Sequence, residues 1–349
     1  ELDFWFCKDY SDSSLLVYRN KKMDYKNLRS YVHCCSVTIL LSVVFAPTLA
    51  AQSGHNVTAA MVENWMTELS NWGRWEEGDQ LGALNLITAD KRVAAARLVQ
   101  TGVSVSLAHN YSVDSNLGSP PPFDQSISML NTSGEYVMER ISFSYHGGIH
   151  SHLDALCHVL WQGKMYNGFS RGEVSEQGCR KLGIANVKQG ILTRGILMDI
   201  PRLKGVDYLP PGTAVYVEDL EAWEEQAGIR VGPGDVIFVR TGRWATPESA
   251  GQGSAGLHAS VAPWLRERDV AVLGGDYAND VIPSGVEGVF LPIHQLAIVA
   301  MGVRLFDNLD LEALAEEAVR QGRWEFMLTA SPIPVEGGVG SPMNPIATF

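Results

Sequence analysis

Short segments rich in β-branched and aromatic residues alternate with amphipathic stretches along most of this chain, and this alternation restricts the fold more than any other feature. Strands are predicted at 103–109, 136–145, 191–200, 214–217, 236–241 and 270–273. Helices are predicted at 217–227, 261–268 and 309–321, and also at 58–72 and from 88 to 100, where Thr58 and Thr88 are the capping residues. Strands interleaved with helices, without a boundary in composition, predict one α/β domain.

The composition is that of a folded, acidic protein. Of the 349 residues, 46% are hydrophobic and 19% are charged, which is enough apolar mass for a sizeable core. The formal net charge is -12. An acidic surface repels nucleic acids and anionic lipids, because both are bound by clustered Lys and Arg. We therefore expect no nucleic-acid partner.

The first 51 residues contain the parts of an export signal. Met23 opens a stretch with Lys26 and Arg29, an apolar run follows at 37–46, and small residues at 47–51 offer a cleavage site. The apolar run is too short to span a bilayer, so we expect no stable membrane insertion after cleavage, although a buried helix or a membrane anchor is the alternative. Since the chain begins with Glu rather than Met, we expect an untranslated upstream extension at 1–22, a signal peptide at 23–51 and a periplasmic or secreted domain at 52–349.

Two cysteines, Cys157 and Cys179, remain after the expected signal peptide. They can pair in an oxidising compartment, but two cysteines alone do not define a disulfide framework. No base is specifically implied for Cys157, so we interpret it as a packing residue rather than as a nucleophile.

Four histidines and an aspartate gather within thirteen residues of the chain: His146, His150, His152, Asp154 and His158. Histidine and carboxylate side chains are common metal ligands. On an extended segment, His150, His152 and Asp154 would project from one face and converge on one ion. A surface cluster of satisfied polar residues is the alternative, but this density favours a metal site.

Two common metal-site patterns fit this segment poorly. The metallo-β-lactamase motif requires a histidine directly after the aspartate, where this chain has Ala155. The amidohydrolase barrels also begin with His-x-His, but their regular β/α repetition is not evident here. Phosphate-binding loops, dinucleotide-binding fingerprints and Gly-x-Ser-x-Gly elbows are not found either.

The segment resembles the motif His-x-Gly-Thr-His-x-Asp-x-Pro-x-His of the cyclase or kynurenine formamidase-like metal hydrolases. His152, Asp154 and His158 match its second histidine, its aspartate and its last histidine. The first histidine of the motif falls on Gly148, so that ligand is missing in register. Either His150 or His146 could supply it, and the resemblance leaves this choice open.

Three further segments are similar to the same family. They are the Trp-containing loop at 75–85, the Leu-Pro-Ile-His294 segment followed by Asp307, and the C-terminal segment at 332–349. The resemblance implies the family's swivelling β/β/α fold in a single domain, which commonly forms homo-oligomers. It also implies one or two divalent ions, Zn²⁺ or Mn²⁺, with the ligands His152, Asp154, His294 and Asp307, and with His150 as the fifth.

The implied reaction is hydrolysis of an amide, lactone or cyclic amide bond in a small-molecule substrate by metal-activated water. His158 is the candidate general base and acid, with a sixth metal ligand as its alternative role. Trp75 is the candidate wall of the substrate pocket, and core packing is its alternative. Two other functions stay open: a metallo-lactonase or amidase of another fold, and a non-catalytic exported binding protein on the same scaffold.

Overall fold

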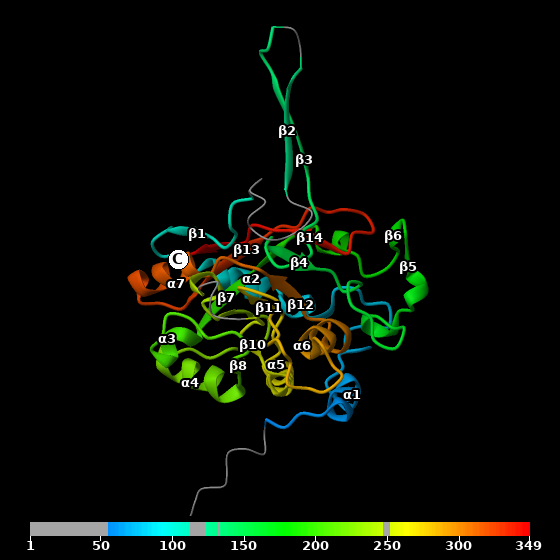
Figure 1. Cartoon of the computed structure of the whole chain (residues 1–349), viewed down its shortest axis with the longest axis vertical. Helices are drawn as coiled ribbons and strands as arrows, with labels where there is room; N and C mark the ends of the chain where they lie inside the picture. Colours follow the sequence, from blue (N-terminus) through cyan, green and yellow to red (C-terminus); the bar gives the residue numbers. More distant parts are fainter. Residues whose placement is uncertain (1–54, 112–122, 131–132, 247–251) are drawn as a thin grey trace, which may run out of the picture. The chain divides into compact units, whose positions relative to one another are not determined.

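A mixed sheet of nine strands forms the centre of the described part of the chain (Figure 1). The structure is a computed structural model that describes residues 55–111, 123–130, 133–246 and 252–349, so the expected extension and signal peptide lie outside it. In spatial order the strands are β1 (Ser104–Ser106), β15 (Ile346–Thr348), β13 (Glu325–Ala330), β7 (Ile191–Asp199), β9 (Val236–Arg240), β11 (Val272–Gly275), β12 (Arg304–Asp307), β4 (His152–Asp154) and β14 (Gly340–Pro342).

The central strands β7, β9, β11 and β12 run parallel to one another, and the flanking strands pair antiparallel. All residues of β9, β11 and β12 are buried, because helices and loops cover both faces of the parallel part. Continuous apolar runs are what such strands require. The predicted α/β fold is confirmed.

The predicted helices are present with small differences at their ends. They are α1 (Ala59–Glu68), α2 (Ala89–Ala96), α4 (Val217–Ala227), α5 (Ala262–Glu267) and α7 (Glu312–Gln321), to which the structure adds α3 (Ile200–Lys204) and α6 (Pro292–His294). The hydroxyls of Thr58 and Thr88 accept hydrogen bonds from the backbone N–H groups of Met61 and Lys91, as expected of N-caps. In the described residues, no helix combines the length and the apolar character that crossing a membrane requires.

Two predicted strands do not join the central sheet. Strand β8 (Ala214–Val215), predicted at 214–217, pairs in parallel with β10 (Gly256–Leu257). Strand β3 (Val137–Ser142) pairs only with β2 (Asp124–Met129), and the two form a hairpin that extends away from the nine-stranded sheet (Figure 1). The alternating pattern at 136–145 correctly predicted a strand, but such a pattern does not identify the partner strand.

The loop at 75–85 is held by internal hydrogen bonds and packs closely against the rest of the fold. The Asp79 carboxylate accepts hydrogen bonds from the backbone N–H of Gly82 at 2.9 Å and from the Asn85 side chain at 2.8 Å. Gly82 has a φ of +62°, and an added Cβ would lie 2.3 Å from the Gly302 carbonyl oxygen, so only glycine fits there. Trp75 packs against the core with the Arg74 guanidinium 5.1 Å from its ring centre. The segment that resembles the family therefore holds the turn in place.

Cys157 and Cys179 form a disulfide. Cys179 lies in β6 (Gly178–Cys179), which pairs with β5 (Val174–Ser175) beside the central sheet. Cys157 lies between Asp154 and His158, so the bond ties the segment that follows β4 to the β5–β6 pair.

Candidate metal centre

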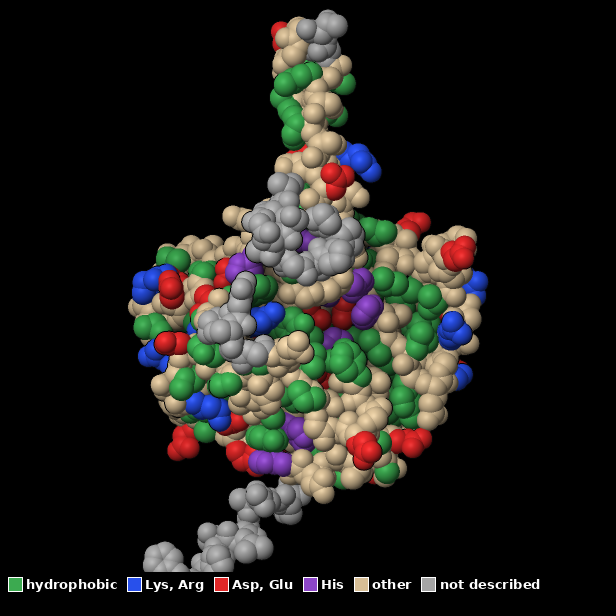
Figure 2. All heavy atoms as spheres, in the orientation of Figure 1, with side chains coloured by type: hydrophobic (Ala, Val, Ile, Leu, Met, Phe, Trp, Pro, Cys, Tyr) green, Lys and Arg blue, Asp and Glu red, His purple; other side chains and the backbone are tan. Residues whose placement is uncertain are grey.

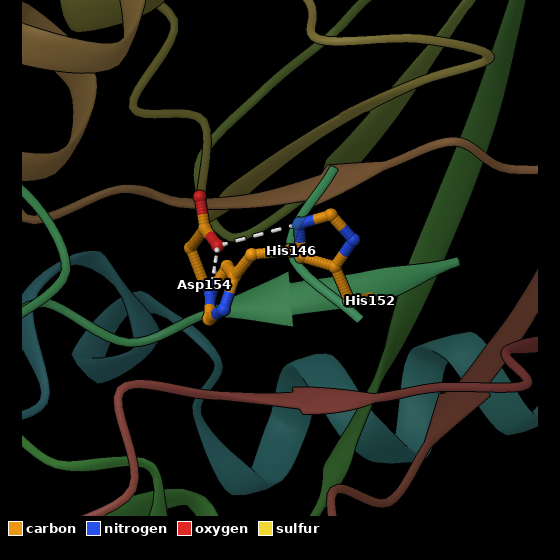
Figure 3. A group of neighbouring side chains, drawn as sticks. All are labelled: His146, His152 and Asp154. Carbon is orange, nitrogen blue, oxygen red and sulfur yellow. Dashed lines mark ion pairs between the residues drawn. The ribbon is translucent and has the colours of Figure 1, made fainter. Parts of the chain in front are cut away.

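Asp154 occupies the middle of a buried group of histidines and aspartates. It is the last residue of β4 and only 1% exposed. Its Oδ1 atom lies 3.4 Å from His146 Nε2 and 3.7 Å from His152 Nε2 (Figure 3). Within the described residues, neither carboxylate oxygen of Asp154 has a hydrogen-bond partner. A buried carboxylate without a partner is costly, so this site calls for a cation.

Strand pairing brings the two distant parts of the group together. Because side chains alternate along a strand, His152 and Asp154 project from one face of β4 while Leu153 enters the core. In the antiparallel pair of β4 and β12, Asp307 is directly opposite His152. This register places the second half of the expected ligand set beside the first.

His294 completes the group from the other side. It ends α6, and its Nε2 atom lies 3.4 Å from Asp307 Oδ2. Among the described residues, two sets of three could each hold a metal ion, with all ligand atoms of a set within 4.8 Å of one another. One set is His146, His152 and Asp154, and the other is Asp154, His294 and Asp307. The structure thus brings together the four residues expected from both sequence regions, and Asp154 belongs to both sets.

In three of these residues, a hydrogen bond on the far side leaves the inner atom available. His152 Nδ1 is 2.7 Å from the carbonyl oxygen of His150, and His294 Nδ1 is 2.6 Å from Asp280 Oδ2. The Asn279 amide donates to Asp307 Oδ1 at 2.6 Å. Partners of this kind fix the orientation of metal ligands and leave the Nε2 and Oδ2 atoms facing the centre.

The structure places His146, rather than His150, beside His152 and Asp154. The chain bends through 146–150 instead of extending, so His150 does not share the face of His152. The His150 ring packs 5.2 Å from Tyr111 and 5.1 Å from Phe143, and it belongs to neither set of candidate ligands in the described residues. A bend cannot be recognised from a spacing of two, which is why the extended-strand expectation placed His150 on the face of His152.

Gly148 stands where the family motif has its first histidine. A Cβ atom built on Gly148 would lie 3.4 Å from the ring of Tyr277, which occupies the neighbouring space. His146, two residues earlier, reaches Asp154 from the start of the bend. Gly148, where the motif histidine is absent, and His146, which reaches Asp154 instead, therefore lie on the same loop.

The ionisable groups of the centre shift one another strongly. Burial alone would raise the pKa of Asp154, but the nearby imidazole of His146 and the charges of the other histidines lower it to about 2. Burial alone would lower the pKa of His294, but Asp307 and Asp280 outweigh it and hold that pKa well above its ordinary value. The Asp154 carboxylate therefore stays ionised and favours positive charge at this position, whether it comes from a proton or from a metal ion.

His158 lies at the edge of the group. Its Nε2 atom is 4.0 Å from Asp154 Oδ1, and its ring stacks on His146 with the ring centres 4.3 Å apart. Burial lowers the pKa of His158, although Asp154 opposes this shift. A neutral imidazole beside the cluster can accept a proton near pH 7.

The cluster lies at the bottom of a cavity of about 440 Å³. Figure 2 shows histidine and acidic side chains gathered in the hollow at the centre of one face. The other walls come from Leu291 of the Leu-Pro-Ile-His294 segment and from residues outside the sequence motifs: Val159, Tyr277, Ala278, Ile282, Phe290 and Gln295. Trp75, the expected wall residue, is not among the residues that line this cavity. His158, in contrast, does line it.

Nitrogen and oxygen ligands of this kind suit a divalent cation. Three imidazoles and two carboxylates match the ligands that Zn²⁺ takes, and carboxylates and imidazoles also suit Mn²⁺. The unpaired oxygens of Asp154 and the unpaired Nε2 of His146 are the atoms such an ion would satisfy. The residues present thus fit the group that the sequence resemblance implies.

Comparison with known proteins gives a consistent result. The family model described as putative cyclase matches residues 41–279. The crystal structure of a protein described as a novel cyclase is 33% identical, with a TM-score of 0.72, and the match covers 80% of this chain and 99% of that chain. A search of curated proteins found no match.

Two isatin hydrolase structures are more distant. The enzyme from Labrenzia aggregata bound to benzyl benzoate is 19% identical with a TM-score of 0.50, and the match covers 74% of this chain and 97% of that one. An isatin hydrolase bound to the product analogue thioisatinate is 17% identical with a TM-score of 0.51. The match covers 74% of this chain and 98% of that chain. At these identities the likeness shows a shared fold.

Proposed function

Since this chain belongs to the cyclase family, we propose that it is a metal-dependent hydrolase with its active site at the Asp154 cluster. The observation that carries this proposal is the buried Asp154 carboxylate, which lies among histidines with both oxygens unpaired. Two proteins that share the fold are named isatin hydrolases, which also supports the proposal.

We assign His146, His152, Asp154, His294 and Asp307 as the residues that hold the metal. Because Asp154 belongs to both sets, the arrangement suits one ion or two ions that share this carboxylate. A bound Zn²⁺ or Mn²⁺ would polarise the scissile carbonyl and lower the pKa of water toward neutrality. The protein's contribution is to orient His152, His294 and Asp307, which hydrogen-bond to the His150 carbonyl, Asp280 and Asn279 respectively.

His158 is assigned the proton transfers. It lines the cavity next to the cluster, and its lowered pKa keeps it neutral and able to accept a proton from the attacking water. It would then return this proton to the leaving nitrogen or oxygen. A position 4.0 Å from Asp154 places it close to the chemistry while other residues supply the ligands.

The cavity supports a small substrate with an apolar body. Val159, Ile282, Phe290 and Leu291 offer apolar surface, while the Gln295 amide can orient a polar group. We propose an amide, a formamide, a lactone or a cyclic amide as the bond that is cleaved. These substrates share a carbonyl carbon that water can attack.

We also propose that the mature protein is periplasmic or secreted. The disulfide between Cys157 and Cys179 supports this location, since such bonds persist in oxidising compartments. Mass spectrometry of the exported protein should find an N-terminus near Ala51. An intact N-terminus on exported protein would contradict the proposal.

The proposed activity is tested by metal analysis and a substrate screen on the same preparation. Purified protein should contain a divalent ion, lose activity on treatment with a chelator, and regain it when Zn²⁺ or Mn²⁺ is restored. The screen uses N-formyl amides, lactones and isatin-like cyclic amides. Metal binding without hydrolysis of any of these classes would favour a binding protein on the same scaffold.

A further inference from the structure

Tyr277 carries a polar group in the cavity that metal binding and the assigned proton transfers leave unused. It lines the cavity beside His158 and the histidine ligands. Within the described residues, its hydroxyl has no hydrogen-bond partner. Because a phenol hydroxyl can donate one hydrogen bond, Tyr277 offers a free donor on the wall of the cavity.

The segment that carries Tyr277 also supports the metal centre. The Asn279 amide donates to one candidate ligand at 2.6 Å, and an Asp280 oxygen lies 2.6 Å from the ring nitrogen of another. The Tyr277 carbonyl accepts a hydrogen bond from the backbone N–H of Asn308 at 3.3 Å. These contacts fix the position of the Tyr277 backbone relative to the ligands.

The Tyr277 ring has a positive charge beside it. The Arg243 guanidinium carbon lies 4.8 Å from the ring centre, which is a cation–π contact. Among the described residues, Arg243 has no ion-pair partner, and its buried Nε atom has no hydrogen-bond partner. A positive charge without a counter-charge favours negative charge nearby. The surroundings of Tyr277 therefore suit an oxygen that carries or develops negative charge.

Gly148 leaves room for the Tyr277 hydroxyl. A Cβ atom built on Gly148 would lie 3.4 Å from Tyr277 Cε2 and 3.5 Å from the hydroxyl oxygen. Because even this first side-chain atom would touch the ring, a histidine at Gly148 would compete with Tyr277 for space. Where the motif has a candidate ligand, this chain thus has a neutral hydrogen-bond donor that reaches the same part of the cavity from another segment.

We propose that Tyr277 is a further catalytic residue, whose hydroxyl donates a hydrogen bond to the carbonyl oxygen of the substrate. When water attacks the carbonyl carbon, a C–O bond forms and an electron pair of the C=O bond moves to this oxygen. The C=O bond re-forms as the bond to the leaving nitrogen or oxygen breaks, and His158 returns the proton of water to the leaving atom. Tyr277 keeps its own proton and stabilises the negative oxygen. This proposal rests on the proposed hydrolase function.

Gln295 is the other uncharged polar side chain of the cavity, and its amide also has no partner among the described residues. Its longer, more flexible side chain would lose more rotational freedom on binding. A donor that is already fixed stabilises developing charge without having to reorganise, which favours Tyr277 for this role. Gln295 suits a contact with the body of the substrate instead.

A binding measurement tests this contact without turnover. Hydrolysis of an amide, a formamide or a lactone leaves a carboxylate, and one of its oxygens is the former carbonyl oxygen. Benzoate is the probe, because it joins a carboxylate to an apolar ring that Val159 and Ile282 can contact. In crystals of metal-loaded wild type soaked with benzoate, we expect a carboxylate oxygen about 2.5–3.0 Å from the Tyr277 hydroxyl oxygen.

Calorimetry with benzoate measures the same contact in solution. Tyr277→Phe keeps the ring and should raise the dissociation constant roughly 10-fold, which is the effect of one hydrogen bond. Tyr216→Phe is the matched control, since Tyr216 stacks on His55 and does not line the cavity, and its affinity should equal that of wild type. Equal affinity of Tyr277→Phe and wild type would overturn the proposal, as would crystals at saturating benzoate without a carboxylate at Tyr277.

Kinetics on the substrate identified by the screen separate catalysis from binding alone. Tyr277→Phe should lower kcat by roughly 10–100-fold and change KM by less than about threefold, with the metal content of wild type, because the hydrogen bond strengthens in the transition state. An increase in KM at unchanged kcat, wild-type kinetics, or loss of the metal would overturn the role of Tyr277 and leave the hydrolase function intact. A wild type that hydrolyses none of the screened classes would instead contradict the hydrolase function, and this role with it.

Discussion

Two buried aspartates of this protein have the same exposure and opposite surroundings. Asp154 and Asp276 are each 1% exposed. Asp276 accepts hydrogen bonds from the backbone N–H groups of Thr241, Gly242 and Arg243 and from the Thr241 hydroxyl, at 2.7–3.1 Å. Asp154 has no hydrogen-bond partner among the described residues. Hydrogen-bond partners, rather than burial, therefore distinguish a structural carboxylate from a candidate metal ligand.

The pKa values of the two carboxyls are shifted in opposite directions: that of Asp276 is raised and that of Asp154 is lowered. Burial raises the pKa of Asp276 despite its hydrogen bonds. At Asp154 burial acts in the same direction, but the surrounding histidines outweigh it and hold the pKa at about 2. Asp276 holds a loop after β9, while Asp154 keeps its negative charge for a cation.

The largest effect is expected for Asp154→Asn. This change removes the shared ligand, so the protein should lose its metal and more than roughly 10⁴-fold in turnover, beyond the usual contribution of a proton shuttle. The metal-free variant should unfold at the same temperature as metal-free wild type or at a higher one, since an unpaired buried charge is removed. Metal analysis, turnover and thermal unfolding on the same samples test this. A variant that keeps its metal would contradict the comparison.

The next largest effect on turnover is expected for His158→Gln. Turnover should fall by roughly 10²–10⁴-fold while the metal content stays that of wild type, because His158 is assigned proton transfer. His109→Gln is a control, since His109 is outside the cavity and paired with Asp310 at 3.6 Å. Loss of metal in His158→Gln would make His158 a ligand, and full turnover would exclude it as the proton carrier.

Asp276→Asn should act on stability alone. The amide cannot accept all the hydrogen bonds that the carboxylate accepts, so the free energy of unfolding should fall by about 2 kcal/mol or more. Urea denaturation measures this loss, and the folded variant should still bind metal with the stoichiometry of the wild type. If Asp276→Asn lost its metal, the contrast with Asp154 would fail.

The smallest effect is expected for His150→Phe. Phenylalanine keeps the ring contacts with Tyr111 and Phe143, so the metal content should not change and the free energy of unfolding at pH 8 should change by less than about 1.5 kcal/mol. Loss of metal would restore His150 to the ligand set.

The same variant has a pH signature. Burial lowers the pKa of His150 below its ordinary value of 6.5, so the folded protein binds this proton less readily than the unfolded chain. The stability that this neutral ring contributes is therefore present above pH 6.5 and lost as the pH falls through the folded pKa. The stability of His150→Phe should decrease less over that interval than the stability of the wild type. Parallel profiles for the two proteins would contradict this.

Sequence patterns predicted the strongly periodic elements well. Helix α4 has the bounds expected from its apolar spacing, and β7 and β9 lie within one residue of their predicted ends. Strands β4 and β14 have only three residues each, which is too short for a periodic pattern. These two short strands are also the ones that frame Asp154, so the sheet edge at the site could not be predicted.

The candidate site was predicted in part. His152, Asp154, His294 and Asp307 converge as the two sequence regions suggested, because β12 pairs with β4. The choice between His146 and His150 depended on a bend, which spacing does not reveal. The supporting residue Asp280 is fourteen positions from His294 and has no motif of its own. Cavity residues such as Phe290 come from loops, whose positions depend on the whole fold.

The central claim is that Asp154 and its neighbours hold a divalent cation. Anomalous diffraction from crystals of wild-type protein grown with Zn²⁺ or Mn²⁺ tests it most directly, with Asp154→Asn as the control. We expect a peak about 2.0–2.3 Å from Asp154 and from its neighbouring histidine nitrogens, and no peak there in the variant. Wild-type crystals at saturating metal without a peak in this group, or with the ion bound only at another place such as His55 and Glu218, would contradict the account.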